Sequence, residues 1–470
     1  MATQGRHLDR LTAVDASFLT NETSASHMHV GAILVFEGPP PKYVDLVEHV
    51  RGRLDQVPRF RQRLVTPPLE AGRPLWADDI NFNLTYHIRH TALPAPGGEQ
   101  QLKRLAARVF SQQLDRSKPL WELWLVQNLE RDRFALLTKT HHAMVDGISG
   151  VDIGTVLFDL EPIPEPAASD DGWVPEPEPS TIDLVARGAV DAAAAPVKVI
   201  ERAVEAVRHP EYAARRIGEA LEGVGEVLGA FADPAPDVPL NQPIGPHRRF
   251  TWASSELATF KRIKDALGGT VNDVVLAVVT GALREWLHDR GVRTEGLELR
   301  ALVPVSIRTQ DERGDLGNRI AAMRGPLPVY VEDPVRRLRV VSEQMEGLKR
   351  SKQALGAEVI SRFNDFAPPT LLAQASRINF STRLFNLIVT NVPGPQIPLY
   401  VLGRELEQVF PVAFLPQNHA LAVAVMSYNG HVGFGLLADY DEMEDVETIA
   451  EGLNRSLAEL EEAAAAAAPA

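Results

Sequence analysis

The sequence predicts a mixed α/β protein of two lobes, each a mixed sheet with flanking helices, joined by a helical connector. At 470 residues, the chain is longer than one ordinary domain and long enough for two. Helix-like and strand-like patterns alternate on both sides of a middle segment, which begins in proline, acidic residues and alanine at residues 161–179 and closes in the proline-rich residues 233–246. We therefore expect lobes at residues 1–165 and 241–470 and a connector at residues 166–240.

The composition excludes several classes of function. The chain is 45% hydrophobic and 23% charged, as in globular proteins with sizeable cores. Its formal net charge of −14 argues against a nucleic-acid partner and against a polybasic membrane patch. There is no cysteine, which excludes disulfides, thiolate catalysis and cysteine-ligated zinc. Neither a signal peptide nor a transmembrane stretch is predicted, so the expected compartment is the cytoplasm.

Patterns in the first lobe predict both strands and helices. Residues 29–38 form an apolar run that predicts a buried strand, and residues 43–54 have the 3.6-residue period of a helix. Residues 100–113 predict a second helix. Further strands are predicted at residues 119–126, which begin at a proline, and at residues 134–140. Two less regular segments are interpreted as a loop followed by a strand: residues 74–79 and 84–88.

The connector and the second lobe continue this mixture. Residues 180–231 carry two apolar helical stripes, which fit either a crossover packed on the body or a lipid-facing element. Ser254 or Ser255 is expected to cap the next helix. Thr270 and Asp273 form a capping-box pattern that opens a strongly apolar helix. The remaining expected elements are strands at 297–307 and 384–390, a hairpin at 420–437 that turns at Asn429-Gly430, and helices at 333–352 and 444–462.

The most distinctive stretch runs from His141 to Gly147 with the pattern His-His-x-x-x-Asp-Gly, directly after a predicted strand. Such a match arises by accident in roughly one chain in a thousand. Side chains alternate along a strand, so only one of the two imidazoles can face a given pocket. A histidine is well suited to remove the proton from a hydroxyl that attacks a thioester. Asp146 could orient that ring directly, or hold the turn through an arginine, which the tight glycine turn favours.

Three other interpretations of the motif are weaker. A histidine pair alone is more often a polar strand end, but Asp146-Gly147 at this spacing reverses that preference. A metal site needs several convergent ligands, whereas adjacent histidines on a strand diverge, so no metal is expected. A serine hydrolase needs a Gly-x-Ser-x-Gly elbow, and the residues around Ser149 have the wrong spacing.

The motifs of this chain resemble those of the bacterial wax ester synthase/diacylglycerol acyltransferase family. The central motif matches the active-site signature of the CoA-dependent acyltransferase superfamily to which that family belongs. The other matching motifs occur in family order and cover most of the chain except residues 165–240. They are Leu11 to Asp15 with Phe18-Leu19, Met28 to Gly31, Pro119 to Glu122, Thr270 to Leu276, Pro304 to Arg308, Gly317 to Arg319 and Asn391 to Pro395.

The resemblance implies a fold and roles for individual residues. The fold would be that of two CoA-dependent-acyltransferase-like lobes. Within the motif that holds His141 and Gly147, His142 would be the general base that deprotonates the acceptor alcohol. Asp146 would be structural, and Arg308 is the candidate for its ion-pair partner. Two further residues match the family's second motif near the substrate channel, although helix capping explains them equally well: Asn272 and Asp273.

The implied function is that of an O-acyltransferase. It would move a long-chain acyl group from acyl-CoA to diacylglycerol or a fatty alcohol by direct histidine-assisted attack, giving triacylglycerol or wax ester. Acyl-CoA would be a co-substrate that enters between the lobes, with no permanently bound cofactor. Contact with a membrane or lipid-droplet surface would be transient and peripheral. The alternatives are a superfamily acyltransferase for another lipid or polyketide alcohol, and a non-catalytic lipid-binding member.

Overall fold

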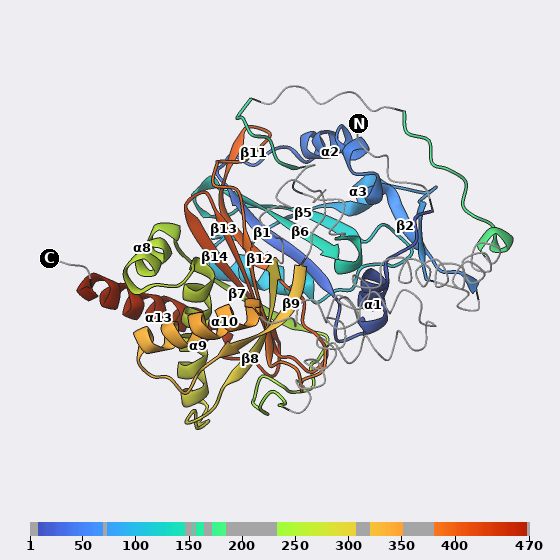
Figure 1. The fold of residues 1–470 in the computed structure, drawn as a ribbon. Helices are drawn as coiled ribbons and strands as arrows, with labels where there is room; N and C mark the ends of the chain where they lie inside the picture. Colours follow the sequence, from blue (N-terminus) through green and yellow to red (C-terminus); the bar gives the residue numbers. More distant parts are fainter. Residues whose placement is uncertain are drawn as a thin grey trace, which may run out of the picture.

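The computed structural model describes residues 8–68, 73–145, 154, 157–163, 172–184, 233–306, 320–350 and 380–467. Within these residues the chain forms two six-stranded sheets and one two-stranded sheet (Figure 1). The two sheet-rich lobes that the sequence predicts are therefore present. Three predicted site residues lie outside the described residues, as does most of the predicted connector: Asp146, Gly147 and Arg308.

The first sheet has the strand order β11-β12-β1-β6-β5-β4. Its pairs are antiparallel, except that β4 runs parallel to β5. In this sheet β6 is the strand that delivers the histidine doublet, and it pairs with β1 along its whole length. The strands are β1 (His29–Phe36), β4 (Ile88–Ala92), β5 (Trp121–Gln127), β6 (Phe134–His141), β11 (Tyr400–Val401) and β12 (Arg404–Val412).

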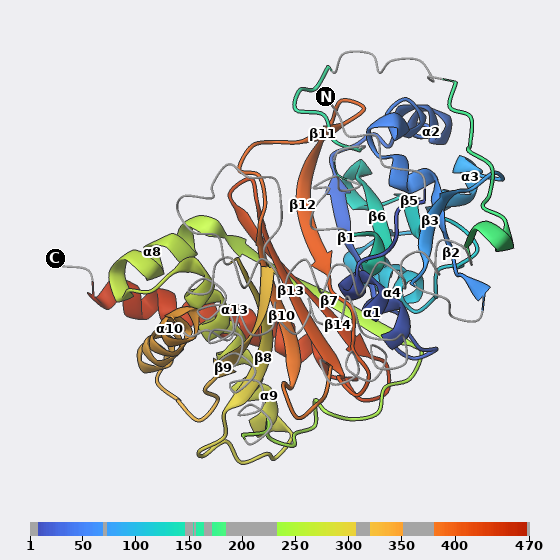
Figure 2. The ribbon, with the colours of Figure 1, turned by 45° about the vertical axis from the view of Figure 1, so that its right-hand side comes forward.

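Two strands of this first sheet come from the last part of the chain. Strand β12 pairs antiparallel with β1, from Gly31 opposite Val412 to Phe36 opposite Leu406, and Figure 2 shows the two strands side by side. The division of the chain at residues 165 and 240 stays a prediction. The pairing adds that residues 400–412, from the stretch expected to form the second lobe, complete the sheet of the first.

The second sheet has the order β7-β14-β13-β10-β8-β9, and β10 runs parallel to both of its neighbours. Its strands are β7 (Arg248–Glu256), β8 (Leu299–Ser306), β9 (Ile320–Leu327), β10 (Leu387–Pro393), β13 (Leu421–Tyr428) and β14 (His431–Asp439). Four helices gather on one side of it (Figure 1): α8 (Leu257–Leu267), α9 (Val271–Asp289), α10 (Pro334–Arg350) and α13 (Val446–Ala467). Among the described helices, none alone is long and apolar enough to span a membrane. Of the helices described, only α8 and α9 taken together have the length and apolar composition of a membrane span, and these two helices meet at a bend of 99°.

Helices and short turns surround the first sheet. The helices are α1 (Ala13–Asn21), α2 (Tyr43–Arg51), α3 (Leu84–His87) and α4 (Glu99–Phe110). The 3-10 turns are η1 (Leu54–Gln56), η2 (Pro58–Arg61), η4 (Glu130–Asp132) and η5 (His142–Met144). Strands β2 (Gln62–Val65) and β3 (Leu75–Asp78) form the small third sheet.

Two local sequence patterns, a capping box and a hairpin turn, predict the observed structure correctly. The hydroxyl of Thr270 accepts a hydrogen bond from the backbone N–H of Asp273, whose carboxylate accepts one from the N–H of Thr270, so α9 begins with the expected capping box. Strands β13 and β14 pair up to Tyr428 opposite His431, which leaves a two-residue turn with positive φ at Asn429 and Gly430. This is the hairpin that Asn-Gly favours.

Three local predictions were wrong. Residues 75–78, expected in a loop, form β3 and pair with β2. Residues 84–87, expected in a strand, form the single turn α3, because the side chain of Asn83 accepts the N–H of Thr85 and starts a helix. Neither Ser254 nor Ser255 caps α8, because β7 continues to Glu256 in register with β14.

The two lobes share a packed interface rather than a loose hinge. Trp252 of β7 stacks on Phe410 of β12, with ring centroids 4.6 Å apart. The buried hydroxyl of Ser26 donates to the carbonyl of Leu415 at 2.6 Å. The side chain of Arg248 in β7 is ion-paired with Asp439. The backbone N–H of Arg248 donates a hydrogen bond to the hydroxyl of Ser111, which follows α4. The end of β6 lies close to this interface, as the contacts of His142 show below.

Candidate active site

The histidine doublet lies at the turn between β6 and η5. His141 ends the strand, in register with His29 of β1, and is fully buried. His142 begins the turn, where its backbone N–H donates to the carbonyl of Met28 at 2.9 Å. The N–H of Val145 then donates to the carbonyl of His142 at 3.1 Å and closes the turn. Both histidine backbones are thus fixed, and the two rings have different neighbours.

The ring of His142 lies in a cluster of phenylalanines drawn from both ends of the chain. It stacks on Phe18 of α1, with centroids 4.0 Å apart and planes 20° apart. Phe414, which follows β12, meets it edge-on at 5.4 Å and 89°. Phe380 packs against Phe18 and Phe414 at 6.2 Å and 5.7 Å. His142 is therefore placed where the first lobe meets the C-terminal part of the chain.

Burial determines the protonation of this ring. His142 as a whole is half-buried, but its Nδ1 atom is enclosed and has no hydrogen-bond partner among the described residues. Burial lowers the pKa of His142 to about 4; a contact with its own backbone opposes this, and the neighbouring His141 adds a smaller lowering effect. At neutral pH the imidazole is uncharged, which is the form that can accept a proton.

His141 belongs to a separate, charged cluster. Its Nδ1 accepts the backbone N–H of Ala143 at 3.0 Å, so its proton is on Nε2, which lies 3.6 Å from the carboxylate of Glu22. The other oxygen of Glu22 lies 3.6 Å from Nε2 of His29, and Arg116 also pairs with this carboxylate. Burial alone would raise the pKa of Glu22, but the contacts with His141, His29 and Arg116 hold it far below its ordinary value. The residue therefore stays ionised.

A buried lysine two residues before the doublet secures the neighbouring helix. Lys139 is fully buried in β6, and its ammonium donates to the carbonyl of Val109 at 2.9 Å and to that of Gln112, at the C-terminal end of α4. Burial lowers its pKa to about 8. A cation at a helix C-terminus satisfies carbonyls that have no partner within the helix. We assign Lys139 to structure, because its contacts are to backbone.

The two predicted residues of the second lobe that the structure describes, Asn272 and Asp273, contact other parts of that lobe. Asn272 accepts a hydrogen bond from the side chain of Asn391 at 3.1 Å, which joins α9 to the end of β10. Asp273 caps α9 and accepts from the hydroxyl of Ser342 at 3.3 Å, so helix capping accounts for its position. Among the described residues no contact connects either side chain with His142. Their role beside a substrate channel stays a prediction.

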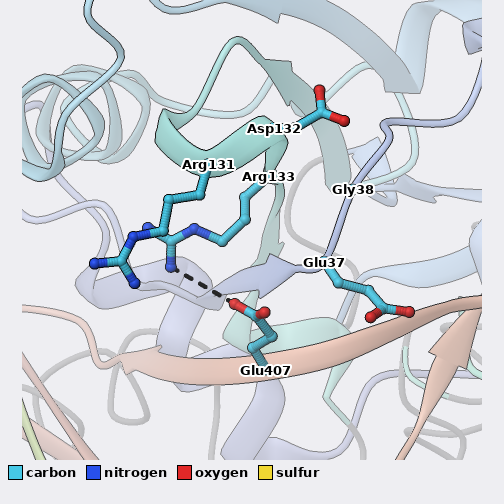
Figure 3. A pocket seen from close by; sticks show the side chains of 6 residues that line it. All are labelled: Glu37, Gly38, Arg131, Asp132, Arg133 and Glu407. Atoms are coloured by element: carbon cyan, nitrogen blue, oxygen red, sulfur yellow. Dashed lines mark ion pairs between the residues drawn. The ribbon is translucent and has the colours of Figure 1, made fainter.

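A hollow of about 310 Å³ lies on another part of the first lobe (Figure 3). Its side chains are of mixed charge, and Arg133 pairs with Glu407 at 3.6 Å across it. It is lined by Glu37, Gly38, Arg131, Asp132, Arg133 and Glu407, none of which the sequence marks as a site residue. This hollow is therefore not the predicted channel.

Acid is expected to destabilise the fold, because several buried or half-buried histidines have lowered pKa values. Their pKa values are lowered by burial, so the unfolded chain binds more protons than the folded chain below pH 6.5, and stability falls as the pH approaches 4. The melting temperature should drop by about 5 °C or more between pH 7 and pH 5 at constant ionic strength. Scanning calorimetry checks this, and a constant melting temperature would contradict it. The histidines are His27, His29, His49, His87, His142 and His419.

Sequence reasoning found the doublet but missed the side chains that surround it. Glu22 and His29 reach His141, and Phe18 and Phe414 reach His142. Phe18 and His29 do fall within motifs that the sequence singles out, but nothing in those motifs indicates which imidazole each would meet. Glu22 carries one usable signal: it follows Phe18 by four residues, the spacing of neighbours on a helix face.

Comparison with known proteins identifies two matching family models. The wax ester synthase/diacylglycerol acyltransferase catalytic domain matches residues 11–275, and the WS/DGAT C-terminal domain matches residues 316–461. The resemblance noted in the sequence motifs is thereby confirmed over most of the chain. The first of these models contains the histidine doublet, and the second contains Phe414.

Individual relatives agree with the family models. A Mycobacterium tuberculosis H37Rv protein named a probable diacylglycerol O-acyltransferase, tgs1, is 34% identical over 457 residues, which is 96% of each chain. The solved wax ester synthase/diacylglycerol acyltransferase of Marinobacter aquaeolei VT8 is 28% identical, with a TM-score of 0.69 and coverage of 97% of this chain and 99% of that one. The starter condensation domain of rhizomide synthetase, solved with C8-CoA, is 13% identical with a TM-score of 0.57 over 97% of this chain and 94% of its own, and shows the shared fold alone. The predicted fold class is confirmed.

Proposed function

This chain belongs to the wax ester synthase/diacylglycerol acyltransferase family, and on that premise we propose that His142 is the general base of its reaction. The chain is an acyl-CoA-dependent O-acyltransferase whose products are triacylglycerol or wax ester. One observation carries the assignment of the base. His142 is a half-buried, uncharged imidazole at the junction of the two lobes, between Phe18 and Phe414.

The transfer can be written as one attack in a ternary complex. The hydroxyl oxygen of the acceptor forms a bond to the thioester carbon while its proton passes to His142. The carbon–sulfur bond then breaks, and the imidazolium returns the proton to the departing sulfur, so an ester and the free thiol of CoA form. Because Nδ1 is enclosed, we assign the proton transfer to Nε2. Direct attack is favoured over an acyl-enzyme because the sequence holds no nucleophile motif.

Other residues support the base without taking part in proton transfer. We assign Asp146 to the turn after His142, with Arg308 as its ion-pair partner. We assign Asn272 and Asp273 to positions beside the substrate channel. Asn272 supports this assignment through its hydrogen bond to Asn391, which ties together two segments that the family shares.

Acyl-CoA is the co-substrate of this family, and we propose that no cofactor is permanently bound. The acceptor would be taken up at a membrane or lipid-droplet surface by peripheral contact from the cytoplasm. Exposed apolar side chains just before the connector and in its first part support such contact. They are Leu160, Ile163, Val174 and Ile182.

The proposal is tested with pure protein and labelled palmitoyl-CoA, supplied with diolein or with hexadecanol. We expect labelled triacylglycerol, wax ester or both, and CoA thiol released in equal amount. Thiol release without any acceptor would indicate a thioesterase instead. No release with either acceptor would contradict the proposal and favour a lipid-binding protein or an enzyme for another alcohol.

A further inference from the structure

Helix α1 contacts both histidines of the doublet from one face. Phe18 lies within the helix, and Glu22 is its C-cap, whose backbone N–H donates to the carbonyl of Phe18 at 3.1 Å. Residues four apart lie one above the other on a helix. Phe18 touches the ring of His142, and Glu22 lies beside the ring of His141. One turn of one helix therefore contacts two side chains that point in different directions.

We propose that α1 is the positioning element of the doublet, with Phe18 fixing the ring of His142 by stacking and Glu22 fixing the ring of His141 by a charged contact. This inference rests on the proposed role of His142 as general base. It goes further by naming the residues that orient the base. Phe18 and Glu22 are positioning residues, because each is proposed to act through the ring of a histidine.

The aromatic packing around His142 supports the proposed role of Phe18. Many catalytic histidines are oriented by a hydrogen bond to the second ring nitrogen. Here Nδ1 has no such partner among the described residues, and aromatic rings occupy two sides of the imidazole. Phe18 covers its face and Phe414 meets it edge-on, so rotation of the ring would push against one or the other. Among the described residues, His141 is the titratable group that acts electrostatically on this ring.

The contacts of Glu22 support its proposed role in fixing the ring of His141. The side chain of Glu22 is 3% exposed, and Arg116 holds it with Nε 2.7 Å from one carboxylate oxygen. Arg116 also donates a hydrogen bond to the carbonyl of Leu19 at 2.8 Å. The guanidinium therefore links the carboxylate of Glu22 to the backbone at the end of α1. His141, in turn, accepts the N–H of Ala143 within η5. Glu22 thus reaches the backbone that carries His142 through the ring of His141.

The test of the first half compares two substitutions of Phe18. Phe18→Leu removes the stacked ring but keeps an apolar side chain, and we expect kcat to fall about tenfold with the KM for acyl-CoA changed by less than about twofold. Water then reaches the imidazole, so the acid limb of the pH–rate profile should move up by about one pH unit. Phe18→Tyr keeps the ring and should restore both values.

Two further variants separate positioning from folding. Leu19→Ala removes half-buried packing from the same helix, and should lower the melting temperature without moving the acid limb. Phe414→Leu removes the edge contact from the other lobe and should move the acid limb in the same direction as Phe18→Leu. It serves as the decisive variant if Phe18→Leu does not fold.

The test of the second half is Glu22→Gln, which keeps the shape and removes the charge. We expect kcat to fall at least about tenfold, while Glu444→Gln on the exposed surface keeps the wild-type rate. If Glu22→Gln and Phe18→Leu fold and keep the wild-type kcat and acid limb while His142→Ala is inactive, the inference is overturned and the proposed function stands. If His142→Ala is itself active, the proposed function fails.

Discussion

Replacing His142 by alanine is expected to lower kcat by at least about 100-fold, because the acceptor hydroxyl then loses the group that takes its proton. The fold should survive the change. The enclosed Nδ1 of His142 has no hydrogen-bond partner among the described residues, and the backbone contacts that hold the turn, from Met28 and Val145, do not depend on the side chain. The measurement is release of CoA thiol from palmitoyl-CoA in the presence of diolein, with circular dichroism to verify the fold.

Two companion variants make the result specific. His431→Ala alters an exposed histidine at the start of β14 and should keep the wild-type rate. Asp146→Ala should lower stability and activity together, because the proposed role of this aspartate is to hold the turn. An Asp146→Ala protein that is fully stable yet inactive would point to a direct catalytic role. Wild-type activity in His142→Ala would remove the mechanism altogether.

Local signals in the sequence account for much of the fold. The capping box at Thr270 and Asp273, the hairpin at Asn429 and the strand that ends at His141 all depend on residues close together in the chain. Each of these elements stands where the pattern predicts it. The turn at residues 84–87 was missed because one capping side chain, Asn83, outweighed the strand-like composition that follows it.

The surroundings of the doublet could not be predicted in this way. His142 and Phe414 are brought together because β12 crosses back to pair with β1, and no periodic pattern reports which sheet a strand will join. The partnership of Glu22 with His141 and His29 likewise depends on α1 packing over the end of β6. The family resemblance implies that His142 is the base, but the contacts around its ring come from long-range packing.

Gly31, the glycine of the Met28 to Gly31 motif, lies where the backbone leaves no room for a larger side chain. Gly31 lies in β1, paired with Lys139 of β6 on one side and with Val412 of β12 on the other. A Cβ atom at this position would lie 1.9 Å from the carbonyl oxygen of Thr138 and 2.8 Å from its carbon. Both atoms are backbone within the sheet, so the clash cannot be relieved by rotating a side chain.

Gly31→Ala is therefore expected to break the pairing that brings His29 opposite His141, and with it the turn that carries His142. The loss of stability should exceed about 4 kcal/mol, as in the most damaging core substitutions, so the variant should be largely unfolded or insoluble at 25 °C. Gly347→Ala, at an exposed position of α10 with open space around its Cβ, is the matched control and should melt at or above the wild-type temperature. A Gly31→Ala protein with wild-type melting temperature and activity would show that β1 and β6 can separate without disturbing the doublet, and the close approach of the two strands would then have no part in placing it.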